Sequence, residues 1–130
     1  MILNHVSNRL DTKHFDVIVE MLKTRLGLIE LRRNERCIWM RQPGANVDLQ
    51  FTRSDSTNRD ADKRGSQVAF LSETPQADLK DLAKWLDSQG LDASVGYWSD
   101  REFYLDVPAA FIDFVIEAMT PDMAEYGVPT

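Results

Sequence analysis

Several side chains able to do acid–base or coordination chemistry lie in segments whose alternation is typical of β-strands. Asp48 and Gln50 alternate with apolar residues over 47–51, and Gln67 begins the apolar segment 67–71. Alternation places the apolar residues toward helices and these polar residues, with His5 of segment 2–7, on the opposite face of a sheet. On a flat sheet such a face is simply solvated, whereas on a strongly curved sheet it lines a cavity. The alternation is compatible with both.

Three aromatic side chains, Trp39, Trp98 and Tyr104, lie on or beside predicted strands. Aromatic rings in such places can stack on planar or cationic ligands, although packing in the core is their commoner role. Together with Gln50 they are the candidate ligand-binding residues.

The sequence lacks the other common active-site patterns. It contains no Gly-rich phosphate loop, no cysteine cluster and no serine motif of a catalytic triad. Its single cysteine, Cys37, adjoins Ile38 and Trp39, so we expect a small core residue rather than a nucleophile.

The net charge and the hydropathy of the chain limit the classes of partner that it can bind. Fifteen Lys and Arg against 21 Asp and Glu leave a formal charge of −6, which disfavours nucleic acid and anionic membrane surfaces as partners. The lone cysteine fits a reducing compartment. No basic leader and no run of the roughly 20 apolar residues that a membrane span needs is present, so we expect a cytoplasmic protein.

Hydrophobic spacing predicts the secondary structure of the first half. Apolar residues from Phe15 to Leu26 recur at helical spacing, which indicates a helix over 12–26 that ends at Gly27. Strands are expected at 2–7, 29–33, 36–40 and 47–51.

The second half repeats this order. A strand at 67–71 precedes a helix over 75–89, which opens with Pro75 and ends at Gly90, and strands follow at 95–98 and 101–105. Residues 109–118 fit two alternatives: a helix capped by Asp106, or a strand, because 111–116 is rich in β-branched and aromatic residues. Asp113 and Glu117 share a face in either.

The two halves also match in length. His5 to Gly27 spans 22 residues and Gln67 to Gly90 spans 23. The repeat predicts an α+β fold of two βαβββ modules, residues 1–52 and 66–118, each with its helix on one face of its sheet. A polar linker, expected to be mobile, occupies 53–65, and a tail follows at 119–130.

Five short motifs in this order resemble the vicinal oxygen chelate superfamily, which includes glyoxalase I, extradiol dioxygenases, and fosfomycin- and bleomycin-resistance proteins. The resemblance implies a cupped mixed sheet with the helices on its convex side, a homodimer, and divalent-metal ligands on the first, fourth, fifth and eighth strands. The motifs are Asn4-His5-Val6, Leu26-Gly27-Leu28, Val47-Asp48-Leu49, Gln67-Val68-Ala69-Phe70 and residues 103–108.

Carried onto this chain, the superfamily's metal ligands are His5, Asp48, Gln67 and Asp113, with Glu117 in place of Asp113 if the register of the eighth strand slips. The chain departs from the pattern, because Asp48 and Asp113 stand where Glu is usual and Gln67 where His is frequent. A nitrogen and oxygen donor set of this kind suits Zn²⁺, Ni²⁺, Mn²⁺ or Fe²⁺.

Two functions therefore stay open. In the first, the protein is a glyoxalase-like lyase, isomerase or dioxygenase: the metal polarises a small oxygen-rich substrate, and Asp113 or Glu117 moves the proton. In the second, it resembles the bleomycin-resistance proteins, and the acidic, aromatic-lined cup of a dimer sequesters a cationic or aromatic compound without a metal.

Overall fold

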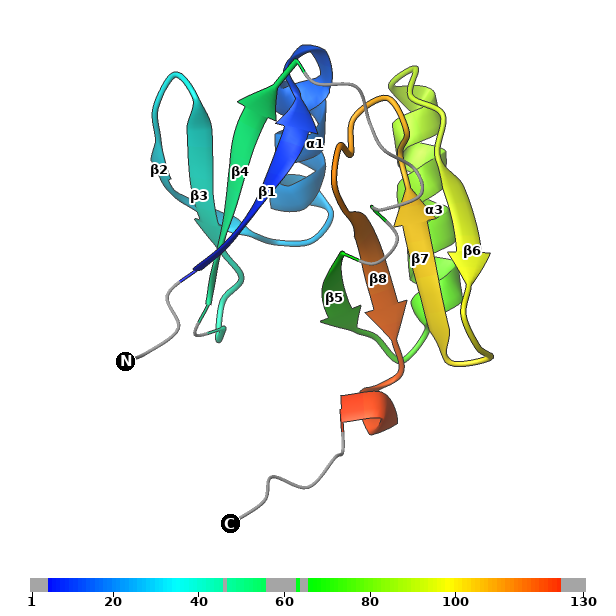
Figure 1. Cartoon of the computed structure of the whole chain (residues 1–130). Helices are drawn as coiled ribbons and strands as arrows, with labels where there is room; N and C mark the ends of the chain where they lie inside the picture. The colour runs from blue at the N-terminus through cyan, green and yellow to red at the C-terminus, as the bar shows by residue number, and fades with distance from the viewer. Residues whose placement is uncertain (1–4, 46, 56–62, 64–65, 125–130) are drawn as a thin grey trace.

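The computed structural model describes residues 5–45, 47–55, 63 and 66–124 of the 130-residue chain. These residues form two βαβββ modules that lie side by side (Figure 1). The first contains β1 (His5–Asp11), a short 3₁₀ helix (Thr12–His14), α1 (Phe15–Thr24), β2 (Ile29–Arg33), β3 (Cys37–Arg41) and β4 (Asp48–Ser54). The second contains β5 (Gln67–Leu71), α3 (Pro75–Ser88), β6 (Ser94–Tyr97), β7 (Glu102–Asp106) and β8 (Val115–Met119), and a 3₁₀ helix (Pro121–Ala124) follows it.

The two sheets have the same topology. The first has the strand order β1-β4-β3-β2 and the second β5-β8-β7-β6. In each, the first and last strands of the module pair in parallel, and the other neighbours pair antiparallel. The predicted α+β fold of repeated βαβββ units is therefore confirmed, and the two sheets stay separate rather than closing into a barrel.

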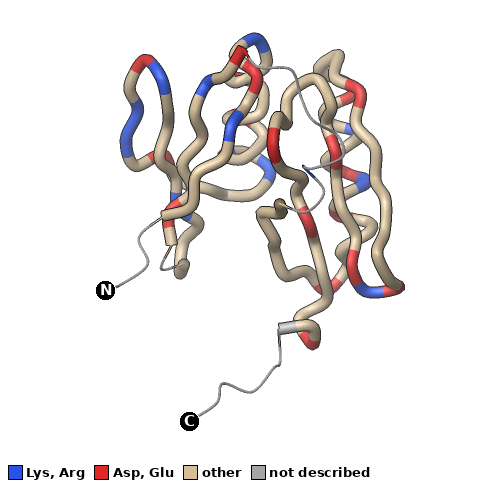
Figure 2. The backbone as a smooth tube through the Cα atoms, in the orientation of Figure 1, with Lys and Arg blue, Asp and Glu red and all other residues tan. Residues whose placement is uncertain are grey.

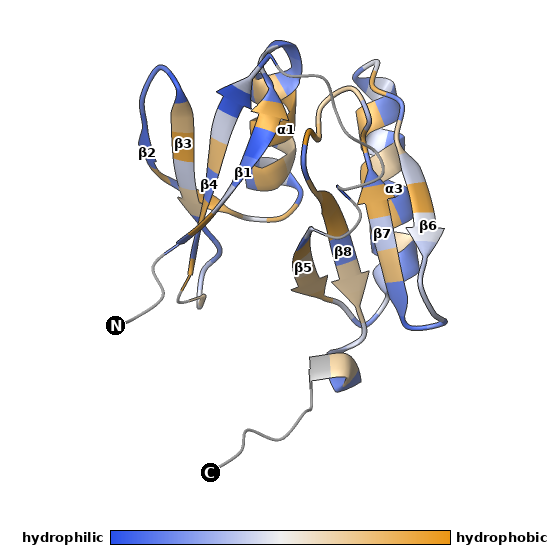
Figure 3. Ribbon diagram, viewed as in Figure 1, coloured by the Kyte–Doolittle hydropathy of each residue, from blue (hydrophilic) through white to orange (hydrophobic). Residues whose placement is uncertain are grey.

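Each helix packs its apolar stripe on its own sheet. Leu22 of α1 and Leu86 of α3 are almost fully buried, and they contribute to one core that runs through both modules. Burial of each such side chain stabilises the fold by about 1.5–3 kcal/mol. Both helices end where glycine allows a left-handed backbone, at Gly27 (φ 70°) and Gly90 (φ 82°). Figure 3 shows apolar residues along much of α1, β7 and β8.

The last predicted element, residues 109–118, forms a strand in its C-terminal half, where β8 begins at Val115. Val107 O accepts hydrogen bonds from Ala110 N (2.9 Å) and Phe111 N (2.8 Å), which makes one tight turn. The chain then extends, because β8 fills the space between β5 and β7 and bonds to both. The helical alternative for 109–118 is wrong, since a helix there would leave the inner edges of those two strands unpaired.

The segment predicted as a polar linker is described only in part. β4 extends to Ser54, and residues 56–62 and 64–65 lie outside the described residues, so its mobility stays a prediction. Lys63 is fully buried, and its Nζ lies 2.7 Å from Asp106 Oδ1 and 2.8 Å from Phe111 O. At least this residue of the linker is anchored to the second module.

The modules are joined at one end of their interface. Leu10 and Phe111 form an antiparallel bridge, and Asp11 N donates to Ala110 O at 2.8 Å. Both bridge residues are fully buried. No helix of the described residues is long and apolar enough to cross a membrane.

Candidate functional site

Strand register places equivalent residues in a row across each sheet, on the face opposite its helix. We call this side of each sheet its open face. The helix-facing neighbours of these rows, such as Phe51 and Ile116, are buried, which fixes the direction of the alternation. The row of the first sheet is Ser7, Gln50, Trp39 and Arg32, and that of the second is Ala69, Glu117, Tyr104 and Gly96.

Two aromatic rings meet on the second open face. The ring centroids of Trp98 and Tyr104 lie 4.4 Å apart at an interplanar angle of 36°. A Cβ atom on Gly96 would lie 2.3 Å from Cζ of Tyr104, so the absence of a side chain there lets this ring lie across β6. Trp98 is 41% exposed. The pair therefore offers a preformed aromatic surface.

A carboxylate lies beside this aromatic pair. Glu117 is the register partner of Tyr104 across β7 and β8 and of Ala69 across β5 and β8. Partial burial raises the pKa of the Glu117 carboxyl, and the nearby Glu102 carboxylate raises it further. Among the described residues no ion pair of Glu117 is found. Because burial and a neighbouring carboxylate destabilise the ionised form of Glu117, a positive charge bound beside it would stabilise that form.

The first open face differs at the same position. The Arg32 guanidinium lies 5.0 Å from the ring centroid of Trp39, and the neighbour of Trp39 on β4 is the neutral Gln50. Here the chain places its own cation over the aromatic ring.

His5 and Asp48, two of the predicted metal ligands, are register partners at the start of β1 and β4. Asp48 is only 8% exposed, and its Oδ1 lies 2.5 Å from Nε of Arg41. This hydrogen bond and charge raise the pKa of Arg41 above its ordinary value. The Asp48 carboxylate is therefore already neutralised by a neighbouring cation.

The other two predicted ligands lie elsewhere. Asp113 comes two residues before β8 and accepts hydrogen bonds from Arg9 N (3.0 Å) and Arg9 Nε (3.2 Å). Arg9 is four residues along β1 from His5, about 13 Å in a strand. Gln67 pairs with Val115, which has no donor atom in its side chain.

The predicted metal set does not gather within one chain. Among the described residues, no three His, Cys, Asp or Glu side chains lie close enough together to hold a metal ion. The two aspartates of the set, Asp48 and Asp113, are each bonded to an arginine. The described residues of a single chain therefore do not fit a resident divalent metal.

Sequence reasoning placed Trp39, Gln50, Trp98 and Tyr104 on or beside strands but missed Arg32, which covers the ring of Trp39. A signal was available in Gly96, because a glycine inside a strand often marks the close approach of another group. The formal charge of each half of the chain was a second signal that the two modules differ. Residues 5–54 carry nine Lys or Arg against six Asp or Glu, a formal charge of +3, and residues 66–119 carry three against ten, −7 (Figure 2).

No family model matches the sequence, and no curated protein matches it. Solved structures do resemble it. A possible glyoxalase from Bacillus cereus is 19% identical, with a TM-score of 0.60 over 92% of this chain and 98% of that one. The bleomycin-binding protein of bleomycin-producing Streptomyces verticillus, solved with copper(II)-bleomycin, is 17% identical, with a TM-score of 0.54 over 92% and 97%.

Lactoylglutathione lyase from Agrobacterium tumefaciens is 11% identical, with a TM-score of 0.54 over 97% of each chain. Identities this low establish a common fold. The activity has to be argued from the side chains of this chain.

Proposed function

We propose that this chain, whose fold is that of the vicinal oxygen chelate superfamily, binds a small organic cation on the open face of its second module, without a resident metal ion. The observation that carries the proposal is the Trp98–Tyr104 pair, with ring centroids 4.4 Å apart, beside the Glu117 carboxylate.

The aromatic pair and the carboxylate attract a cation by different means. A cation over an aromatic face gains about 0.5–1 kcal/mol when exposed and about 2 kcal/mol when desolvated. When ionised, the Glu117 carboxyl adds a negative charge. Burial and the Glu102 carboxylate raise the pKa of this carboxyl. A bound positive charge lowers the pKa of this carboxyl and so opposes both effects, which means that the ligand and the ionised carboxylate favour each other.

The first module supports this reading by analogy. Its equivalent aromatic residue, Trp39, is covered by Arg32 at 5.0 Å. In the second module the strand position that corresponds to Arg32 is occupied by Gly96, the partner of Tyr104. An external cation would take the place that the chain's own guanidinium takes in the first module.

A second copy of the chain would complete the site. The opposite formal charges of the two halves, +3 and −7, favour pairing of the first module of one copy with the second module of another. A homodimer of this kind would cover the open faces and exclude water from a bound ligand. The expected particle has twice the 14.9 kDa chain mass.

A metal-dependent enzyme is the second candidate. The observation that favours it is the register pairing of His5 with Asp48. In a dimer, Gln67 and Glu117 of a second copy could add donors, a bound divalent metal would supply Lewis-acid chemistry, and Asp113 or Glu117 would hold the proton. The ion pairs of Asp48 with Arg41 and of Asp113 with Arg9 weigh against it.

Calorimetric titration with benzyltrimethylammonium, after treatment with a chelator, tests the proposal. We expect saturable binding of the cation, and at least tenfold weaker competition for the same site by the uncharged isostere neopentylbenzene. Trp98→Ala should weaken binding of the cation at least tenfold. Gln50→Ala, a change at the equivalent of Glu117 in the first module, is the matched control and should leave it unchanged.

A different pattern would favour the second candidate. If the cation does not bind, and a divalent metal instead raises the melting temperature in a manner that His5→Ala abolishes, the metal-free proposal is wrong.

A further inference from the structure

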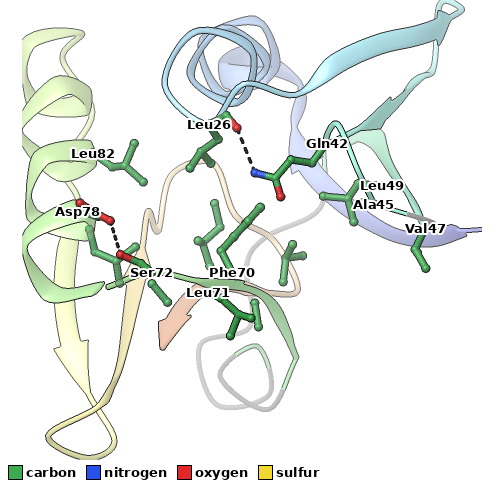
Figure 4. Close-up of a pocket in the computed structure, with 15 residues that line it drawn as sticks. Leu26, Gln42, Ala45, Val47, Leu49, Phe70, Leu71, Ser72, Asp78 and Leu82 are labelled. Carbon is green, nitrogen blue, oxygen red and sulfur yellow. Dashed lines mark hydrogen bonds between the residues drawn. The ribbon is translucent and has the colours of Figure 1, made fainter. Parts of the chain in front are cut away.

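We propose a second ligand site, for an uncharged apolar ring compound, in a cavity between the two modules. The cavity has a volume of about 440 Å³, within the usual range for small-molecule sites. Its walls come from both modules: Leu26, Gln42 and Val47 from the first, and Phe70, Leu71 and Leu82 from the second (Figure 4).

The cavity lies mostly apart from the open faces, and of their two rows of residues it reaches Ala69 on the edge strand β5. It is lined by Val68 and Phe70 of β5 and by Ile116 of β8, which point toward α3, and by Leu79 of α3 itself. Glu117, Tyr104 and Trp98 are not part of its lining. A ligand in the cavity and a cation at the Trp98–Tyr104 pair would therefore contact different residues.

The cavity exists because the two modules differ just before their last strands. β4 and β8 begin at equivalent positions, since Asp48 pairs with the first residue of β1 and Val115 with the first residue of β5. Before β8 the chain carries bulky residues, and before β4 it carries small ones. Phe111, Ile112 and Phe114 thus correspond to Gly44, Ala45 and Val47.

The bulky residues close their end of the interface. Phe111 and Phe114 stack with ring centroids 4.5 Å apart, and Phe111 bridges to Leu10. At the other end the residue equivalent to Leu10 is Ser72, which lines the cavity with Ala45 and Val47. The missing ring volume at this end is the space that a ring-bearing ligand would fill.

The polar groups on the lining are bonded within the protein. Gln42 Nε2 donates to Leu26 O at 3.2 Å, and the Ser72 hydroxyl donates to the Asp78 carboxylate. Asp78 also accepts from the Thr74 hydroxyl at 3.1 Å. Asp78 is exposed to solvent and is the one charged residue among the described residues of the lining, which is otherwise mostly apolar. The lining therefore favours an uncharged apolar compound. Leu71, 52% exposed, would gain cover at the rim.

Fluorescence titration of the full chain with N-phenyl-1-naphthylamine tests this site. We expect saturable, blue-shifted emission with one probe per chain. Ala45→Phe and Val47→Phe place at this end the kind of side chain that closes the other end, and each should reduce the affinity at least tenfold. Ala109→Phe puts the same ring on an exposed position at the closed end, outside the cavity, and should leave the affinity unchanged.

Two results would overturn the inference: equal probe binding by the wild type and both filling variants, or probe binding that disappears as the protein concentration rises. The second would mean that another copy of the chain covers the cavity. Glu117→Gln and saturating benzyltrimethylammonium should leave probe binding unchanged. Failure of the organic-cation site and failure of this cavity site are therefore observed separately.

Discussion

The two open faces have one backbone plan and different side chains at equivalent positions. Trp39 and Tyr104 occupy the same place in their rows, as do Gln50 and Glu117. In the first module Arg32 covers the ring, while in the second Trp98 extends the aromatic surface beside a carboxylate. A repeated fold can thus keep its strand register while a few substitutions change its surface. In one half the chain's own arginine covers the aromatic ring, and in the other half the rings are left for a ligand.

The ends of the module interface differ in the same way. Aromatic rings fill one end, and residues as small as alanine leave a cavity at the other. Packing volume rather than backbone geometry separates a structural contact from a candidate site here. The predictions below test these differences, from the largest expected effect to the smallest.

Truncation at the two ends should have very different costs. Phe111→Ala removes a fully buried ring and should lower the free energy of unfolding by about 3–5 kcal/mol. Val47→Ala, at the position equivalent to Phe114, borders an existing cavity and should cost less than about 1 kcal/mol. Urea denaturation measures both. Equal costs would show that the closed end does not hold the modules together.

Much of the fold followed from the sequence because it depends on local patterns. The helical stripes and the glycines at 27 and 90 identified both helices, and the repeat spacing identified the modules. Residues 109–118 stayed ambiguous, because their conformation is decided by β5 and β7, which are distant in the chain.

The candidate site was less predictable, because its contacts are not local. Asp113 binds Arg9 across 104 residues of sequence, and no pattern around either residue indicates the contact. The row positions of Gln50 and Trp39 depend on the register of two strands against each other. Alternation gives the face of a residue but not its neighbour on the next strand.

Equivalent ion pairs in the two modules should also differ. Arg41 and Asp106 hold corresponding positions on β3 and β7, and each has a partner of opposite charge. The Asp106–Lys63 pair is almost wholly buried. Asp106→Asn leaves the buried ammonium of Lys63 without a counter-charge and should lower the free energy of unfolding by about 3 kcal/mol.

Asp48→Asn breaks the Arg41 pair, in which the arginine side chain is 46% exposed. Its cost should be a small fraction of the cost at Asp106, because water can solvate the freed guanidinium. Thermal unfolding of the two variants at neutral pH measures the difference. A similar loss in both would contradict the assigned burial.

The first open face should become receptive when it is given the features of the second. Arg32→Gly with Gln50→Glu uncovers Trp39 and places a carboxylate beside it, as Gly96 and Glu117 do beside Tyr104. Calorimetry should then find a second benzyltrimethylammonium site per chain, weaker than the first because Asn34 stands at the position equivalent to Trp98. Gln50→Glu alone, with Arg32 still over the ring, is the control and should keep a single site.

The smallest effect concerns the proton on Glu117. The pKa of the Glu117 carboxyl is higher in the folded protein than its unfolded value near 4.5. Below that pH the carboxyl is protonated in both states and does not destabilise the fold. Stability is lost as the pH rises from that value toward the folded pKa. Glu117→Gln removes this loss and should stabilise the ligand-free protein at neutral pH by about 0.3 kcal/mol, since solvent screens a partly exposed group.

The same proton gives cation binding its pH dependence. A cation prefers the ionised carboxylate, so the affinity of the wild type for benzyltrimethylammonium should fall as the pH is lowered through the raised pKa of Glu117. The affinity of Glu117→Gln should be weaker at neutral pH and flat over the same range, because the amide does not titrate. Calorimetry at several pH values compares the two. Parallel pH profiles would show that another group controls binding and would separate the aromatic pair from its neighbouring carboxylate.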